Sequence, residues 1–164
     1  MVMTEPIHEN DFYRYIWDGK SLVNGVNPYL YEPAAVHLYE HGIEEPFYDE
    51  ESGVEFNGRP WSEADKERLD TLTRLRNANR LYHDRIGHQQ IPTVYPPVAQ
   101  GVFALSVALF DDTELGAIVG LKLILLAFDV GCIGLVIALL SVLNRRSGLV
   151  IFYAWSPLIV VEFA

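Results

Sequence analysis

An apolar run from residue 115 to residue 143, interrupted only by Lys122 and Asp129, limits most strongly what this chain can fold into. About 20 consecutive apolar residues are enough for a helix to cross the hydrocarbon core of a bilayer. This run is longer, so its helix can cross with a tilt or extend beyond the core. We therefore predict a transmembrane helix over residues 115–143, and a second one that begins in residues 149–164.

The first part of the chain, residues 1–97, is suited to water rather than to lipid. Residues 1–97 carry 17 of the 22 acidic residues and 9 of the 12 basic ones, whereas residues 98–164 are almost all apolar. The acidic excess argues against nucleic-acid binding, which needs a basic surface. Cys132 is the one cysteine and lies in the apolar run, so it provides neither a disulfide framework nor a metal site.

Both ends of the sequence suggest a longer protein. Residues 1–10 lack the basic and apolar regions of a signal peptide, and residue 164 lies inside an apolar segment. We expect one membrane span before residue 11 and several after residue 164. The predicted fold class is all-α: a fragment of a polytopic helical membrane protein, whose extracytoplasmic loop region contains juxtamembrane helices.

Charge predicts the orientation of this fragment. Arg145 and Arg146 follow the long span, and basic residues beside a span favour the cytoplasm. The long helix then runs inward, residues 144–148 form a cytoplasmic turn, and residues 1–97 lie outside the cell's inner (plasma) membrane. This placement requires that residues 98–114 form a helix on the membrane surface and a loop. In the alternative, residues 98–110 are a short span and residues 1–97 lie inside.

Two predictions concern the polar region itself. The sequence SEAD at residues 62–65 has the pattern of a capping box, and leucines follow at helical spacing, which predicts a helix from about Glu63 to Tyr82. Residues 44–60 are acidic and contain two glycines and a proline, which predicts a solvated loop.

The densest cluster of chemistry-bearing residues is DFYRYIWDGK at residues 11–20, followed by NGVNPY at residues 24–29. Charged groups beside aromatic rings suit a sugar, because hydroxyls pair with the charges while ring faces cover the apolar side of the pyranose. The alternative is an amphipathic juxtamembrane helix with an aromatic belt and local ion pairs. Four side chains of the cluster share one face of a helix: Asp11, Arg14, Tyr15 and Asp18.

This cluster resembles the first-loop motif of bacterial GT-C glycosyltransferases, polytopic enzymes that use polyprenyl-phosphate sugars. The chain departs from the family's pattern because the first span before Asp11 and the segment after residue 164 are missing, and because residues 40–80 resemble an insertion. Three further segments resemble the family's later motifs, in the same order: IPTVYPPVAQ at residues 91–100, LK at residues 121–122 with Asp129, and YAWSPL at residues 153–158 with Glu162.

The resemblance implies transfer of a hexose such as mannose from a polyprenyl-phosphate donor to a glycan or lipid acceptor outside the cytoplasm. Asp11 matches the family's first-loop aspartate, the base that takes the proton from the acceptor hydroxyl. The fragment alone is expected to be inactive. No cofactor is implied, and a requirement for a divalent metal stays open. The remaining candidate substrate-binding residues are Arg14, Tyr15, Asp18, Tyr95, Lys122 and Glu162.

A non-catalytic transporter or assembly subunit is the alternative, as is a truncated inactive product. Ionisable residues inside a span usually face a protein interior or a cavity. In the enzyme, Lys122 would bind the lipid phosphate. In a transporter, Asp129 would line a path near the midplane of the membrane. The structural alternative is that both residues pair with side chains of another helix. No metal site is predicted, because the spacing of the histidines and of the acidic residues fits no metal motif.

Overall fold

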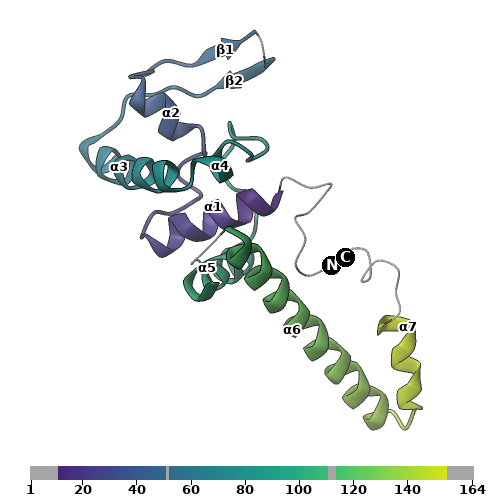
Figure 1. Ribbon diagram of the computed structural model, residues 1–164. Helices are drawn as coiled ribbons and strands as arrows, with labels where there is room; N and C mark the ends of the chain where they lie inside the picture. Colours follow the sequence, from purple (N-terminus) through teal and green to yellow (C-terminus); the bar gives the residue numbers. More distant parts are fainter. Residues whose placement is uncertain (1–10, 51, 111–113, 155–164) are drawn as a thin grey trace.

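The computed structural model describes residues 11–50, 52–110 and 114–154. Its helices fall into two parts: a polar region at one end and a long apolar helix that extends away from it (Figure 1). Helix α1 (Asp11–Val23) lies at the centre of the polar region. The helices around it are α2 (Ala35–Glu40), α3 (Glu63–Ala78), α4 (Arg80–His83) and α5 (Pro97–Phe110).

One face of α1 builds the core of the polar region. Ile16 and Trp17 are buried there against apolar side chains of the helices on the side of α2, α3 and α4. Burying a large apolar side chain stabilises a fold by about 1.5–3 kcal/mol, so these contacts hold the helices on α1. The core partners include Val36, Leu38, Leu69, Leu72, Tyr82 and Ile86.

The opposite face of α1 packs against α5 at very short range. A Cβ atom built on Gly19 would lie 2.6 Å from the carbonyl oxygen of Phe103. Only a glycine allows the two backbones to approach this closely. The contact therefore brings the second half of α1 directly against α5.

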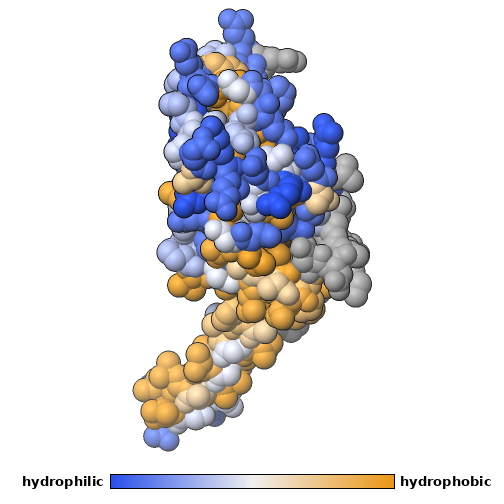
Figure 2. All heavy atoms as spheres, turned by 90° about the vertical axis from the view of Figure 1, so that its left-hand side faces the viewer, coloured by the Kyte–Doolittle hydropathy of each residue, from blue (hydrophilic) through white to orange (hydrophobic). Residues whose placement is uncertain are grey.

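Helix α6 (Glu114–Val142) is the long apolar helix. Ala117, Ile118 and Leu121 are buried near its beginning, where Ser106 of α5 donates a hydrogen bond to the Ala117 carbonyl at 3.1 Å. Most of the remaining side chains of α6 are exposed and apolar, which gives the lower part of Figure 2 its hydrophobic surface. Within the described residues, Gly116–Val142 is the one helix long and apolar enough to cross a membrane.

The prediction of a mostly helical fold with an apolar span is therefore confirmed, whereas a polytopic arrangement stays a prediction. After α6 the chain turns back through the 3-10 helix η1 (Ser147–Val150) into α7 (Ile151–Ala154). The greater part of the second predicted span, residues 155–164, lies outside the described residues.

Two predictions about the polar region need correction. The capping box at Ser62 is present, but the helix that it starts ends at Ala78 rather than near residue 82. Asn79 interrupts it: its backbone leaves the helical conformation, with φ −134°, and its amide donates to the Leu75 carbonyl and accepts from Lys20 Nζ at 2.7 Å. Side chains of this type compete with the helical hydrogen bonds of the backbone.

The second correction concerns residues 44–60, which are not wholly a loop. They contain an antiparallel hairpin of β1 (Phe47–Asp49) and β2 (Val54–Phe56), whose turn includes Gly53 at φ +68°. Phe47 and Phe56 face each other across the strands, with ring centroids 5.3 Å apart. Cross-strand aromatic pairs stabilise hairpins, and here the pair outweighs the acidic composition that predicted a loop.

The predicted orientation in the membrane can be tested by labelling single cysteines in a Cys132→Ser background. We expect Ser52→Cys, in the exposed β1–β2 turn, to react with an impermeant maleimide from outside. Ser147→Cys should react only after the membrane is opened. Strong labelling of Ser147→Cys in intact cells, with protection of Ser52→Cys, would show that the chain has the opposite orientation.

The buried side chain of His83 is expected to make the stability of the polar region depend on pH. The side chain is 4% exposed, its Nε2 lies 3.1 Å from the Pro33 carbonyl, and burial lowers its pKa below the usual 6.5. The unfolded chain therefore binds a proton at this residue more readily than the folded one. The stability that the neutral His83 ring contributes is fully present above about pH 6.5 and is lost as the pH falls below that value.

We expect His83→Gln to reduce the acid-induced fall in the midpoint of thermal unfolding. His41→Gln is the control, because that ring is exposed. Equal pH dependence of the wild type and His83→Gln would show that His83 does not cause the effect.

Candidate functional site

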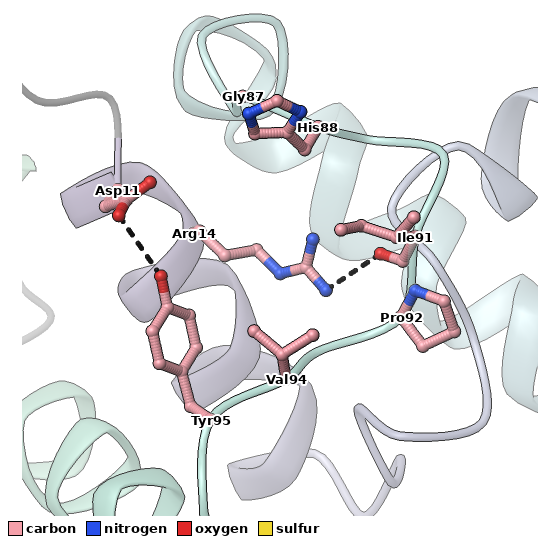
Figure 3. A pocket seen from close by; sticks show the side chains of 8 residues that line it. All are labelled: Asp11, Arg14, Gly87, His88, Ile91, Pro92, Val94 and Tyr95. Atoms are coloured by element: carbon pink, nitrogen blue, oxygen red, sulfur yellow. Dashed lines mark hydrogen bonds between the residues drawn. The ribbon is translucent and has the colours of Figure 1, made fainter. Parts of the chain in front are cut away.

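A cavity of about 210 Å³ opens between the start of α1 and the segment that precedes α5. Asp11 is the first residue of α1 and is exposed at this cavity, while Arg14 reaches into it from the next turn (Figure 3). The sequence segments 11–14 and 87–95 thus form one site. Its lining residues are Asp11, Arg14, Gly87, His88, Ile91, Pro92, Val94 and Tyr95.

Tyr95 connects the two sides of the cavity. Its hydroxyl donates to Asp11 Oδ2 at 3.2 Å, and its carbonyl accepts a hydrogen bond from the Tyr29 hydroxyl. Burial, followed by the hydrogen bond to Tyr15, raises the pKa of Tyr95 well above 10, so its hydroxyl stays protonated. Asp11 is therefore oriented by a neutral donor, and its charge is not cancelled by this contact.

Arg14 is held by a buried network behind the cavity. Its Nε donates to Asp18 Oδ1 at 2.9 Å, and one terminal nitrogen donates to the Ile91 carbonyl at 3.1 Å. The other carboxylate oxygen of Asp18 accepts from Gln100 Nε2 at 3.0 Å, and the same nitrogen lies 2.8 Å from Thr93 Oγ1. These bonds fix the guanidinium between α1 and the segment before α5, as Figure 3 shows for Ile91.

The two carboxylates of α1 are therefore in different situations. Asp18 is 1% exposed and both of its oxygens have protein partners, so it has no accessible oxygen for a substrate. Asp11 is exposed and its one described partner is the Tyr95 hydroxyl. The helical spacing predicted that both residues share a face; the depth to which each is buried depends on α5.

Aromatic rings form the side of the site towards α5. Tyr15 stacks on Phe103 with ring centroids 4.6 Å apart, and the ring of Tyr95 meets Tyr15 edge-on at 4.9 Å. Tyr15 does not line the cavity; it supports the ring of Tyr95, which does. Arranged in this way, the rings hold the hydroxyl of Tyr95 next to Asp11.

The charged residues of the long helix lie apart from this cavity. Lys122 is 8% exposed, and its Nζ lies 5.9 Å from the ring centroid of Phe12, the residue after Asp11. Asp129, seven residues further, accepts a hydrogen bond from Tyr153 of α7 at 3.0 Å. Lys122 is thus close to the start of α1, whereas Asp129 is used to join α6 to α7.

Of the residues predicted for the site, Asp11, Arg14 and Tyr95 share the cavity, with Tyr15 and Asp18 behind them. Glu162 lies outside the described residues. Sequence reasoning gave no role to His88, Ile91 or Gln100. The family resemblance covered the IPTVYPPVAQ segment, which contains Ile91 and Gln100, but it did not single out these two residues. Nothing in the sequence distinguishes His88; the structure does, because its backbone has a φ of +53°.

No group of three or more histidine, cysteine, aspartate or glutamate side chains is placed to hold a metal ion within residues 11–50, 52–110 and 114–154. Comparison of the chain with protein-family models, with curated proteins and with solved structures gave no match. The geometry of the site, the apolar helix and the resemblance of the motifs are therefore the basis for a functional proposal.

Proposed function

We propose that the protein is a membrane glycosyltransferase in which Asp11 is the general base. It would move a hexose from a polyprenyl-phosphate donor to a hydroxyl group of a glycan or lipid outside the cytoplasm. The observation that supports this proposal is the difference between the two carboxylates of α1. Asp11 is exposed at a cavity, whereas Asp18, on the same helix, is buried and fully bonded.

The chemistry requires a free carboxylate. As the acceptor oxygen attacks the anomeric carbon, Asp11 takes its proton, the bond between that carbon and the phosphate oxygen breaks, and polyprenyl phosphate leaves with the bonding electrons. Proton transfer of this kind needs a base within hydrogen-bond reach of the hydroxyl. The Tyr95 hydroxyl holds one oxygen of Asp11 at 3.2 Å, which orients the carboxylate.

The position of the cavity suits a donor that is anchored in lipid. Phe12, next to Asp11, lies against Lys122, about two turns into the helix that is apolar enough to cross a membrane. A cation at this depth suits the phosphate of a lipid-linked donor, because opposite charges attract more strongly near a lipid phase than in bulk water. Arg14 also lines the cavity, but Asp18 balances its charge, so Lys122 is the cation proposed for the phosphate.

The experiment that tests this proposal is a transfer assay. The full-length protein in proteoliposomes is supplied with a panel of polyprenyl-phosphate hexoses and with outer-membrane or cell-wall glycans as acceptors. We expect release of polyprenyl phosphate together with a glycosylated product for one donor. Absence of transfer with every donor, combined with substrate uptake that depends on Asp129, would favour the transporter instead.

A further inference from the structure

The exposed apolar side chains of the polar region are confined to two parts of the chain. Residues 21–31 and residues 86–110 contain no aspartate, glutamate, lysine or arginine. Among the described residues from 11 to 110, the exposed large apolar side chains lie in these two uncharged segments, except for Phe47 and Tyr48 of the hairpin. The first segment covers the end of α1 and the loop after it, and the second ends with α5.

In α5 the exposed apolar side chains form one stripe. Val98, Leu105 and Leu109 are exposed, and their spacing of seven and four residues places them on one face of the helix. A Cβ atom built on Gly101, which is on the same face, would meet no atom within 4 Å. The opposite face packs against α1 through Phe103. An exposed apolar face of this kind marks a contact with a membrane or with another protein.

The loop after α1 lies next to this stripe. Leu22 and Tyr29 share the walls of a cavity of about 340 Å³ with Pro97, the first residue of α5. Val23 and Leu30, beside them in the sequence, are also exposed. The two uncharged segments therefore adjoin, and we refer to the exposed apolar side chains of residues 22–30 and 98–109 as the apolar underside.

The direction of the long helix indicates what covers the apolar underside. Helix α5 lies below α1, on the side towards which α6 extends, whereas the β1–β2 hairpin lies at the opposite end (Figure 1). The hydrophobic surface of α6 continues onto the lower side of the polar region (Figure 2). Since Gly116–Val142 is long and apolar enough to cross a membrane, a bilayer around this helix would also meet the apolar underside.

We propose that the apolar underside docks into the interfacial layer of the bilayer, so that the loop after α1 contacts lipid together with α5. Irregular backbone that faces lipid is not found in the hydrocarbon core, which assigns the loop to the interface. Tyrosine is enriched at that level, and helices with one apolar face lie there in the membrane plane. Composition assigned residues 22–30 to water, whereas the structure places them beside the stripe of α5.

This docking would set the position of the cavity at Asp11. The Tyr29 hydroxyl donates to the Tyr95 carbonyl, and the Tyr95 hydroxyl donates to Asp11. Contact of the loop with lipid therefore fixes the height of the cavity above the membrane, whatever substrate the cavity takes. The inference does not depend on glycosyl transfer.

Nitroxide labels on single cysteines test the proposal, in the full-length Cys132→Ser protein in phosphatidylcholine nanodiscs. Leu30→Cys places a label on the loop, and Val98→Cys and Leu109→Cys place labels at the two ends of the stripe. Tyr48→Cys is the control, because Tyr48 is also exposed but lies in the acidic hairpin. Electron paramagnetic resonance measures how often each label collides with oxygen, which concentrates in lipid, and with a water-soluble nickel chelate.

We expect the three labels of the apolar underside to collide more often with oxygen than with the chelate, and to lie at similar depths. The Tyr48→Cys label should show the reverse. Collision with the chelate at Leu30→Cys as frequent as at Tyr48→Cys would overturn the proposal. So would a difference in depth of about 16 Å between Val98→Cys and Leu109→Cys, the length of this stretch of helix, because α5 would then cross the membrane.

Slow motion of the labels with protection from both reagents would also overturn it, because another protein segment would then cover the surface. Circular dichroism confirms that each labelled variant is folded. Lipid contact at all three labels in a protein that transfers no sugar would keep the docking surface and reject the glycosyltransferase. Sugar transfer by a protein whose labels are in water would keep the enzyme and reject the docking surface.

Discussion

Asp11→Asn in the full-length protein is expected to lower sugar transfer by about 10²–10⁴-fold, the usual contribution of a general base. The substitution keeps the size and shape of the side chain and its hydrogen bond from Tyr95, but an amide cannot take the acceptor's proton. The loss should appear in kcat more than in donor binding. Radiolabelled donor and separation of the glycosylated product provide the measurement.

Folding should be unaffected by this substitution, because Asp11 is exposed and its one described hydrogen bond can be kept. Protein level in the membrane and the helical circular-dichroism signal must match those of the wild type. Unchanged turnover in Asp11→Asn would mean that the cavity at the start of α1 is not a catalytic site, and that the cluster is a structural juxtamembrane helix.

Arg14→Met is expected to destabilise the polar region by about 3–5 kcal/mol, because it leaves a buried carboxylate without its cation. Asp18 is 1% exposed and would keep only the hydrogen bond from Gln100. Thermal unfolding in detergent, followed by circular dichroism and tryptophan fluorescence, measures the change.

The matched control is Arg80→Met. Arg80 and Asp84 also form an i, i+4 ion pair, but at 3.9 Å and with both side chains largely exposed. Exposed pairs contribute little, so this change should leave the unfolding midpoint close to that of the wild type. If the two arginine variants lose the same stability, the buried Arg14–Asp18 pair stabilises this fold no more than the exposed Arg80–Asp84 pair does.

The elements that were predicted well depend on local signals. The Ser62 capping box requires only the order of neighbouring residues, and the helix that follows it begins at Glu63 as expected. The apolar helix depends on composition over a long window, and the structure places it at Glu114–Val142, within one residue of the predicted limits. Neither signal needs knowledge of distant contacts.

The elements that were missed depend on contacts that composition and helical spacing do not reveal. Asn79 ends α3 partly through its bond to Lys20, 59 residues away, and the hairpin depends on the cross-strand pairing of Phe47 with Phe56. The site shows the same limit. Helical spacing placed Asp11 and Asp18 on one face, but only the packing of α5, with Gln100 of α5 against Asp18, shows which carboxylate is buried.

The most direct test of the account compares turnover per folded molecule for Asp11→Asn and Asp18→Asn. Transfer is measured in proteoliposomes and divided by the folded amount, determined by circular dichroism and resistance to protease. The account predicts that Asp18→Asn lowers the folded amount while the folded molecules still transfer sugar, because Asp18 only positions Arg14. Asp11→Asn should fold normally and transfer almost none. Full turnover by Asp11→Asn, with none from correctly folded Asp18→Asn, would contradict the assignment of Asp11 as the base.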